Sequence, residues 1–160
     1  MSRKLELTPR KVPRQSRAQA TVDAILEATR RLLLKEGYAA VTTNHVADLA
    51  GTSIGTLYQY FPSIDSLVTK LYQNLKEELS TRIGVTVATQ DGAPLVEVAA
   101  AVVTTLLSTY GEEAQLNQIL CDLAPDIGAL RKVKDIDAQS ISLLSDYLTS
   151  RGIPDAQARG

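Results

Sequence analysis

The sequence of 160 residues lacks the residues that small proteins use as cross-links or metal ligands. It holds one cysteine, which excludes a disulfide framework within the chain. Its one histidine and one cysteine, His45 and Cys121, stand too far apart to build a Cys/His zinc finger. Tryptophan is absent, and 9 Gly and 6 Pro are too few for a collagen-like or low-complexity chain. We therefore expect no metal and no cofactor. We also expect a hydrophobic core large enough to be stable without disulfide or metal cross-links.

Long apolar segments are missing as well. No run approaches the roughly 18 apolar residues that cross a membrane. The richest stretch, residues 96–107, is interrupted by Glu97, Thr104 and Thr105. The N-terminal residues MSRKLELTPRKVPRQSR carry charge but no apolar segment, unlike a secretory signal peptide. These absences predict a cytoplasmic protein with no membrane partner.

Little in the sequence suggests catalysis. No Ser/His/Asp or Cys/His arrangement, glycine-rich phosphate loop or paired-carboxylate motif stands out. No Lys or Arg lies within eight residues of Cys121, and Asp122 is adjacent, so we expect a buried structural thiol rather than a redox sensor. His45 is expected to be an exposed residue of a short helix. The protein is predicted not to be an enzyme.

Charge is distributed unevenly along the chain. Residues 1–70 hold 10 Lys/Arg against 6 Asp/Glu, whereas residues 71–160 hold 7 against 12. The first twenty residues carry six cations and a single acid, Glu6. A basic end on a neutral or acidic body is typical of a nucleic-acid contact, although a solvated tail without a partner has the same composition.

The spacing of apolar residues predicts an all-α fold. Ser16, Thr42 and Ser53 stand where helix N-caps belong. Gly37, Gly51, Gly111 and Gly152 stand where helices should end. The expected helices cover about 17–36, 43–50, 54–60, 64–88, 95–110, 116–123 and 125–150, the last with Pro125 as its first residue.

The two short helices around Gly51 form a predicted helix-turn-helix. On a helical wheel Leu57 and Phe61 point inward, with Ile54 near them. A water-facing surface would usually carry Lys and Glu, but the opposite face carries small or neutral hydrogen-bonding groups, which suit the major groove: Gln can bond adenine, a Thr methyl can meet thymine, and glycine lets the backbone approach closely. That face and its flanks comprise Thr52, Gly55, Thr56, Tyr58, Gln59 and Tyr60.

The stretch TTNHVADLAGTSIGTLYQYFPSIDSLVTKLY closely resembles the DNA-binding domain of the tetracycline-repressor (TetR) family of bacterial transcription regulators. The similarity extends back through AILEATRRLLLKEGYAAVTT and covers about residues 17–72. The rest of the chain matches only in helical pattern. The resemblance implies an N-terminal three-helix DNA-binding domain followed by a helical domain for ligand binding and dimerisation.

The resemblance also implies roles for single residues. Thr42 and Thr43 would bond phosphate, Tyr58 and Tyr60 would contact the phosphate backbone at the groove edge, and further residues would face bases or nearby phosphates: Thr52, Ser53, Gly55, Thr56 and Gln59. Ile54 and Ile64 stand where the family often has a basic residue that grips phosphate. Cations of the N-terminal segment would compensate, and we name Arg10, Lys11, Arg14 and Arg17 as that arm.

We accordingly expect three parts: a basic arm of residues 1–15, a helix-turn-helix domain of residues 16–63, and a helical effector-binding and dimerisation domain of residues 64–160. A small molecule bound to the last part would shift the population away from the DNA-binding form. Candidate effector contacts are Leu106, Tyr110, Ile119 and Tyr147. Packing remains the alternative role for the two tyrosines.

The predicted function is that of a transcriptional repressor that binds double-stranded operator DNA as a homodimer. The usual dimer helices of the family have no counterpart after residue 150, so three alternatives stay open: a truncated chain, a different dimer built by the last three helices, or weak dimerisation. Two other functions also remain: a DNA-binding protein without an effector, and a helical module for protein contacts. The sequence identifies neither effector, operator nor regulated genes, and does not separate repressor from activator.

Overall fold

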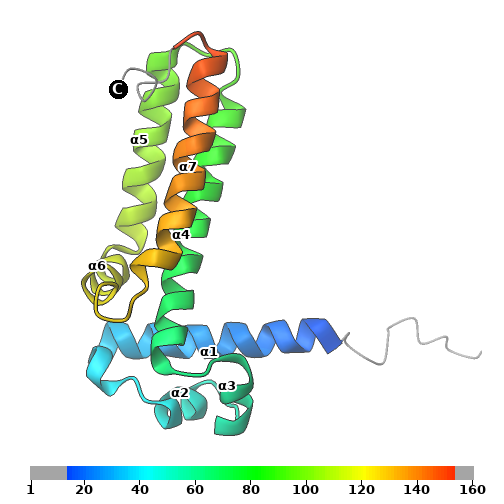
Figure 1. Ribbon diagram of the computed structural model, residues 1–160, viewed down its shortest axis with the longest axis vertical. Helices are drawn as coiled ribbons and strands as arrows, with labels where there is room; N and C mark the ends of the chain where they lie inside the picture. The colour runs from blue at the N-terminus through cyan, green and yellow to red at the C-terminus, as the bar shows by residue number, and fades with distance from the viewer. Residues whose placement is uncertain (1–13, 154–160) are drawn as a thin grey trace, which may run out of the picture. The chain divides into compact units, whose positions relative to one another are not determined.

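The computed structural model describes residues 14–153, without some side chains in the first turn of α1 and the first half of α7. Every regular element in this range is helical, and two compact units divide at Ile64/Asp65. We call residues up to Ile64 the head and those from Asp65 the body. The elements are α1 (Arg14–Glu36), the 3-10 helix η1 (Tyr38–Ala40), α2 (Thr43–Leu49), α3 (Ile54–Tyr60), α4 (Ile64–Thr89), α5 (Leu95–Glu112), α6 (Ala114–Leu123) and α7 (Leu130–Ser150) (Figure 1).

The head consists of α1, the short η1 and the helix pair α2–α3. The α1 helix contacts α2 and η1, and α2 contacts α3. Its core is aliphatic, and each fully buried leucine or isoleucine contributes roughly 1.5–3 kcal/mol to folding. The central buried side chains are Ile25, Leu33, Val46 and Leu57.

The start of α1 corrects one expectation. The helix begins at Arg14, so Ser16 lies in its first turn and is not the N-cap. Arg and Gln are good helix formers, so residues 14 and 15 can belong to the helix. Arg14 and Gln15, expected in the arm, therefore belong to the helical part of the chain.

The body contains three long helices, α4, α5 and α7. The short helix α6 follows α5 and precedes α7 in the chain (Figure 1). A polar cluster joins α4 to α5. The guanidinium of Arg82 donates to Glu112 at 2.9 Å and to Glu78 at 2.8 Å. Bonding to Glu112 and then to Glu78 raises the pKa of the Arg82 guanidinium above its ordinary value, so this cation stays charged throughout the physiological range. Thr86 and Thr105 add a hydroxyl contact of 2.9 Å across the same seam.

The segment between α6 and α7 corrects a second expectation. Pro125 does not begin α7, which starts five residues later at Leu130. Gly128 adopts φ +67°, and the N–H of Ala129 donates to the carbonyl of Ala124 at 3.0 Å. This pair of features closes a turn in the manner of a helix C-cap, so the helical run from Pro125 cannot continue. Gly111 differs in the opposite sense, because it has no positive φ and α5 runs through it to Glu112.

Cys121 also differs from expectation, because its side chain is exposed. The buried stripe of α6 is formed by Leu116 and Leu120, and Cys121 lies one position past that stripe. Its Sγ lies 3.5 Å from the hydroxyl of Tyr72. Cys121 is therefore not part of the hydrophobic core, and the prediction of a buried thiol is wrong.

The α5 helix leaves much apolar surface uncovered. Val96, Val103 and Leu107 are 80%, 52% and 70% exposed. By length and composition alone α5 could cross a membrane, and only 11% of that window is buried. A single helix of this kind is weak evidence for a membrane span, because a helix covered by another protein surface has the same composition.

Candidate nucleic-acid interface

The turn between α2 and α3 depends on Gly51, which adopts φ +65°. The N–H of Thr52 donates to the carbonyl of Ala47 at 3.0 Å, and that of Gly51 donates to Asp48 at 3.2 Å. Any other L-residue would be strained at this φ. The glycine therefore ends α2 and turns the chain into α3, as the sequence predicts for a helix-turn-helix.

Both N-caps predicted for these helices are confirmed. The hydroxyl of Thr42 accepts the N–H of His45 at 3.2 Å, and that of Ser53 accepts the N–H of Thr56 at 3.0 Å. Ser53 and Thr56 also hold their hydroxyl oxygens 2.9 Å apart. This pair fixes the hydroxyl groups at the start of α3 before any partner arrives.

The two faces of α3 differ as the helical wheel predicts. Leu57 is fully buried and Phe61 is 7% exposed. Gly55 and Gln59 are exposed, and Tyr58 and Tyr60 are 52% and 39% exposed. Thr42 and Ser53 are exposed as well, whereas three threonines are half-buried: Thr43, Thr52 and Thr56. The structure thus brings all nine predicted DNA-contacting residues onto α2 and its N-cap, α3, and the turn between the two helices. Their roles toward DNA stay predictions.

Gly55 has no conformational reason to be glycine. Its φ is not positive, and a Cβ built there would meet only the Ser53 hydroxyl, at an ordinary 3.8 Å. An alanine would fit and would favour the helix by roughly 0.5–1 kcal/mol. The conformation and packing of the chain therefore do not require a glycine at position 55.

Ile54 is not where the helical wheel places it. It was predicted to face inward beside Leu57, but its side chain is 42% exposed. As the first residue of α3 it has no preceding turn to cover it. It lies one turn before Tyr58, so an apolar group and an aromatic ring are neighbours at the edge of the outer face. A helical wheel gives the direction of a side chain but not how far neighbouring residues bury it at a helix end. Sequence reasoning therefore missed that Ile54 is exposed.

The outer face of α3 carries no ionised side chain. Of the cations assigned to the arm, Arg17 is exposed in α1. Arg10 and Lys11 lie outside the described residues, as does the side chain of Arg14. His45 is exposed, as predicted, in the first turn of α2. Within residues 14–153 no three His, Cys, Asp or Glu side chains among those described gather as a metal site requires.

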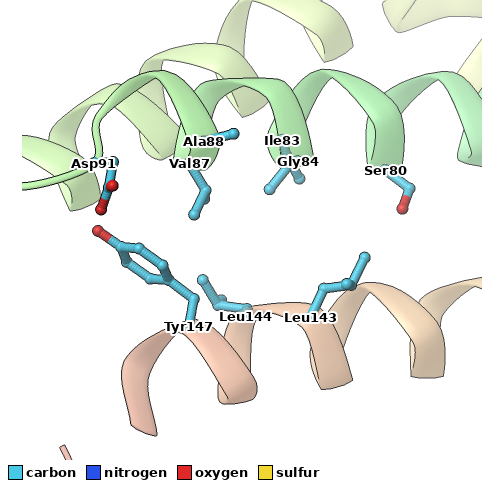
Figure 2. A pocket seen from close by; sticks show the side chains of 9 residues that line it. All are labelled: Ser80, Ile83, Gly84, Val87, Ala88, Asp91, Leu143, Leu144 and Tyr147. Atoms are coloured by element: carbon cyan, nitrogen blue, oxygen red, sulfur yellow. The ribbon is translucent and has the colours of Figure 1, made fainter. Parts of the chain in front are cut away.

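The four residues named as effector contacts do not share one site. Leu106 and Tyr110 lie in α5, Ile119 in α6 and Tyr147 in α7, all half-buried. Only Tyr147 lines the slot between α4 and α7 that Figure 2 shows. Tyr110 instead has the ammonium of Lys76 at 6.0 Å from its ring centre. Their effector role remains a prediction.

Residues 25–71 match the family described as bacterial regulatory proteins of the tetR family. This segment of the chain is thus similar to the TetR family. The match covers α2, the glycine turn and α3, together with the second half of α1 and the start of α4. The resemblance read from the sequence is thereby confirmed.

Two repressors named KstR are similar to part of this chain. The one from Mycobacterium tuberculosis is 54% identical over 39 residues, which is 24% of this chain and 18% of the relative. The one from Rhodococcus jostii is 41% identical over 58 residues, 36% of this chain and 27% of the relative. The similar stretch is thus well under half of either relative.

Solved structures extend the similarity of fold to both units. A TetR family regulator from Marinobacter aquaeolei aligns with a TM-score of 0.65 over 88% of this chain and 76% of its own, at 21% identity. The fatty acid degradation regulator FadR from Bacillus halodurans aligns with a TM-score of 0.61 over 89% of this chain and 69% of its own, at 20% identity. These likenesses confirm the predicted all-α fold with an N-terminal helix-turn-helix.

Proposed function

We propose that this protein is a transcriptional repressor that binds operator DNA through α3 and leaves it when a small molecule binds the body. The observation that carries the proposal is the outer face of α3, which offers hydrogen-bonding and apolar groups but no charge. The similarity of part of the chain to two repressors supports the same function. It acts by binding rather than by catalysis.

In this proposal α3 enters the major groove. Gln59 reads an adenine edge, and Thr52 and Thr56 offer hydroxyl and methyl groups to neighbouring bases. Ile54 joins this set, because an exposed apolar side chain can meet a thymine methyl. Gly55 lets the helix backbone approach the groove.

Phosphate contacts position the helix. Thr42 and Thr43 stand at the N-terminus of α2, where backbone N–H groups favour an anion. Tyr58 and Tyr60 flank the outer face of α3, where both are exposed, and contact the DNA phosphate backbone at the edges of the groove. Because α3 has no cation, a large part of the non-specific affinity comes from cations near the N-terminus, namely Arg10 and Lys11 ahead of α1 and Arg14 and Arg17 at its start.

The DNA-bound species is a homodimer. Helix-turn-helix half-sites mirror the two-fold axis of the protein and lie about 34 Å apart. The exposed apolar side chains of α5 suit a symmetric contact, since two copies of an uncharged face pack without like-charge repulsion. In α7, Ile141 and Leu143 are also exposed, at 63% and 61%.

Selection of duplexes from a random pool tests this function without knowledge of the operator. The full chain should enrich an inverted repeat whose half-sites are about one helical turn apart. The variant Gln59→Ala, carried through the same selection, should lose preference at one base pair of each half-site. A helical protein-interaction module would enrich no sequence, and that outcome would refute the proposal.

A further inference from the structure

The second half of α4 and the second half of α7 enclose a slot of about 420 Å³. Figure 2 shows the two helices facing one another across it. The volume lies within the usual range of small-molecule sites. Its walls are Ser80, Ile83, Gly84, Val87, Ala88 and Asp91 from the α4 side and Leu143, Leu144 and Tyr147 from α7.

The middle of the slot is apolar and open. Ile83 and Val87 face Leu143 and Leu144, and Figure 2 shows no polar group between them. Gly84 leaves room, since a Cβ built there meets nothing within 4 Å. The α4 wall from Ser80 to Ala88 spans about 12 Å at 1.5 Å per residue. An elongated apolar body fits this shape.

One end of the slot is polar and negative. The carboxylate of Asp91 and the hydroxyl of Tyr147 point toward one another there (Figure 2). Among the side chains that the structure describes, Asp91 has no hydrogen-bond or ion-pair partner. The nearby cation, Arg151, is not among the lining residues: it donates to the carbonyl of Ala93 and, at 3.3 Å, to the Tyr147 hydroxyl.

The C-terminus of α4 lies at the same end of the slot. This helix ends at Thr89, two residues before Asp91, and its last turn contains no basic residue. The free carbonyls of a helix C-terminus carry about half a negative charge and favour a cation. The Asp91 carboxylate and a helix end that has no basic residue of its own thus act together at one end of an apolar slot.

We propose that the α4–α7 slot binds an elongated amphiphile whose apolar chain lies against Ile83, Val87 and Leu144 and whose cationic amine head meets Asp91. The slot is then the effector site of the repressor, a designation that rests on the proposed function. The binding chemistry does not, because it can be measured on the protein without DNA.

Calorimetry on the full chain with three ten-carbon probes tests the head group. Decylammonium, 1-decanol and decanoate share one apolar chain and differ in charge, and each is used below the concentration at which it aggregates. We expect decylammonium to bind about threefold to tenfold more tightly than decanol, from the carboxylate and the helix end together. Decanoate should bind most weakly. Equal binding of the amine and the alcohol, or tighter binding of decanoate, overturns the proposal.

Asp91→Asn isolates the carboxylate. It should bring amine binding to within about twofold of alcohol binding, leaving only the helix end to discriminate. Asp146→Asn is the matched control, because it removes an exposed carboxylate of α7 that does not line the slot. An amine preference that survives Asp91→Asn, or is lost equally in the control, contradicts the assignment.

Gly84→Leu tests the location. The leucine side chain would fill the slot, and replacing a helical glycine favours folding, so loss of binding cannot be ascribed to unfolding. Binding of decylammonium and decanol should fall at least about tenfold together. Gly111→Leu is the control, because Gly111 is also helical, exposed and open at Cβ but lies outside the slot. Unchanged binding in Gly84→Leu refutes the site.

A separate titration with the selected DNA distinguishes this inference from the proposed function. If the protein binds no DNA sequence, the repressor proposal fails, whereas the calorimetric result for the slot stands. If DNA binding is specific but the amine preference is absent, the repressor proposal stands and the ligand class fails.

Discussion

The outer faces of α3 and α5 are both uncharged at their centres, yet they suit different partners. The α3 face offers Gln59 and threonine hydroxyls beside two tyrosines, so it can exchange hydrogen bonds with water for hydrogen bonds with base edges. The α5 face offers Val96, Val103 and Leu107, which can exchange water only for other apolar groups. The two uncharged faces therefore differ in hydrogen-bonding capacity.

The largest expected effect on DNA binding comes from placing a charged residue on the exposed apolar face of α5. Leu107→Glu should abolish the dimer and lower operator affinity about 100-fold or more, because the two heads then bind independently. Light scattering and operator titration measure both consequences. Val85→Glu is the control, since Val85 is an apolar α4 residue that is 58% exposed. A dimer that survives Leu107→Glu would assign the interface elsewhere.

On α3, Gln59→Ala should cost about 1–3 kcal/mol at particular base pairs and relax specificity there. Tyr58→Phe should instead weaken all sequences alike, because it removes a phosphate partner. Titration of each variant with operator and with random DNA separates the two. Equal losses on both DNAs for Gln59→Ala would show that Gln59 does not read bases.

Gly55→Ala should change stability and binding in opposite directions. The free energy of unfolding should rise by roughly 0.5–1 kcal/mol, because alanine favours the helix and fits the available space. DNA affinity should fall by about 1–3 kcal/mol, because the added methyl group crowds the groove. Denaturant melts and operator titrations give the two numbers. Unchanged affinity would mean that the α3 backbone does not approach the DNA closely.

Removal of residues 2–13 should weaken binding to all DNA sequences. The segment carries Arg3, Lys4, Arg10 and Lys11 against Glu6, and the deletion leaves α1 intact from Arg14. For each phosphate that the shortened chain no longer neutralises, the slope of log K against log salt should become shallower by about 0.9. Salt titrations of both chains provide the comparison. Identical slopes would identify the segment as an inert tail.

Ile64→Lys should have the smallest effect and the opposite sign. Ile64 is the first residue of α4 and half-buried, so a lysine there can lay its stem along the surface and extend its ammonium outward. One new phosphate contact per subunit should steepen the salt slope of a dimer by roughly 2. A slope equal to that of the unaltered chain would place Ile64 away from the phosphate backbone.

The fold of the head was predictable because its signals are local. Caps at Thr42 and Ser53 and the positive φ of Gly51 each depend on neighbours within five residues. The body was less predictable in detail. Pro125 is a residue that favours the start of a helix, but Gly128, three residues later, favours the end of one. Only the backbone hydrogen bonds of the structure show that the segment forms a turn at Gly128 and not the start of α7.

By itself the sequence determined the all-α fold, the helix-turn-helix and the face of α3 that looks outward, because helix periodicity and capping act through bonds between near neighbours. Tertiary structure alone decided which apolar residues stay uncovered and where a ligand can enter. Ile54 and Cys121 are exposed, and Tyr147 and Asp91 line one slot, because burial depends on helices that are far apart in the chain. Such contacts leave no periodic pattern in a single sequence.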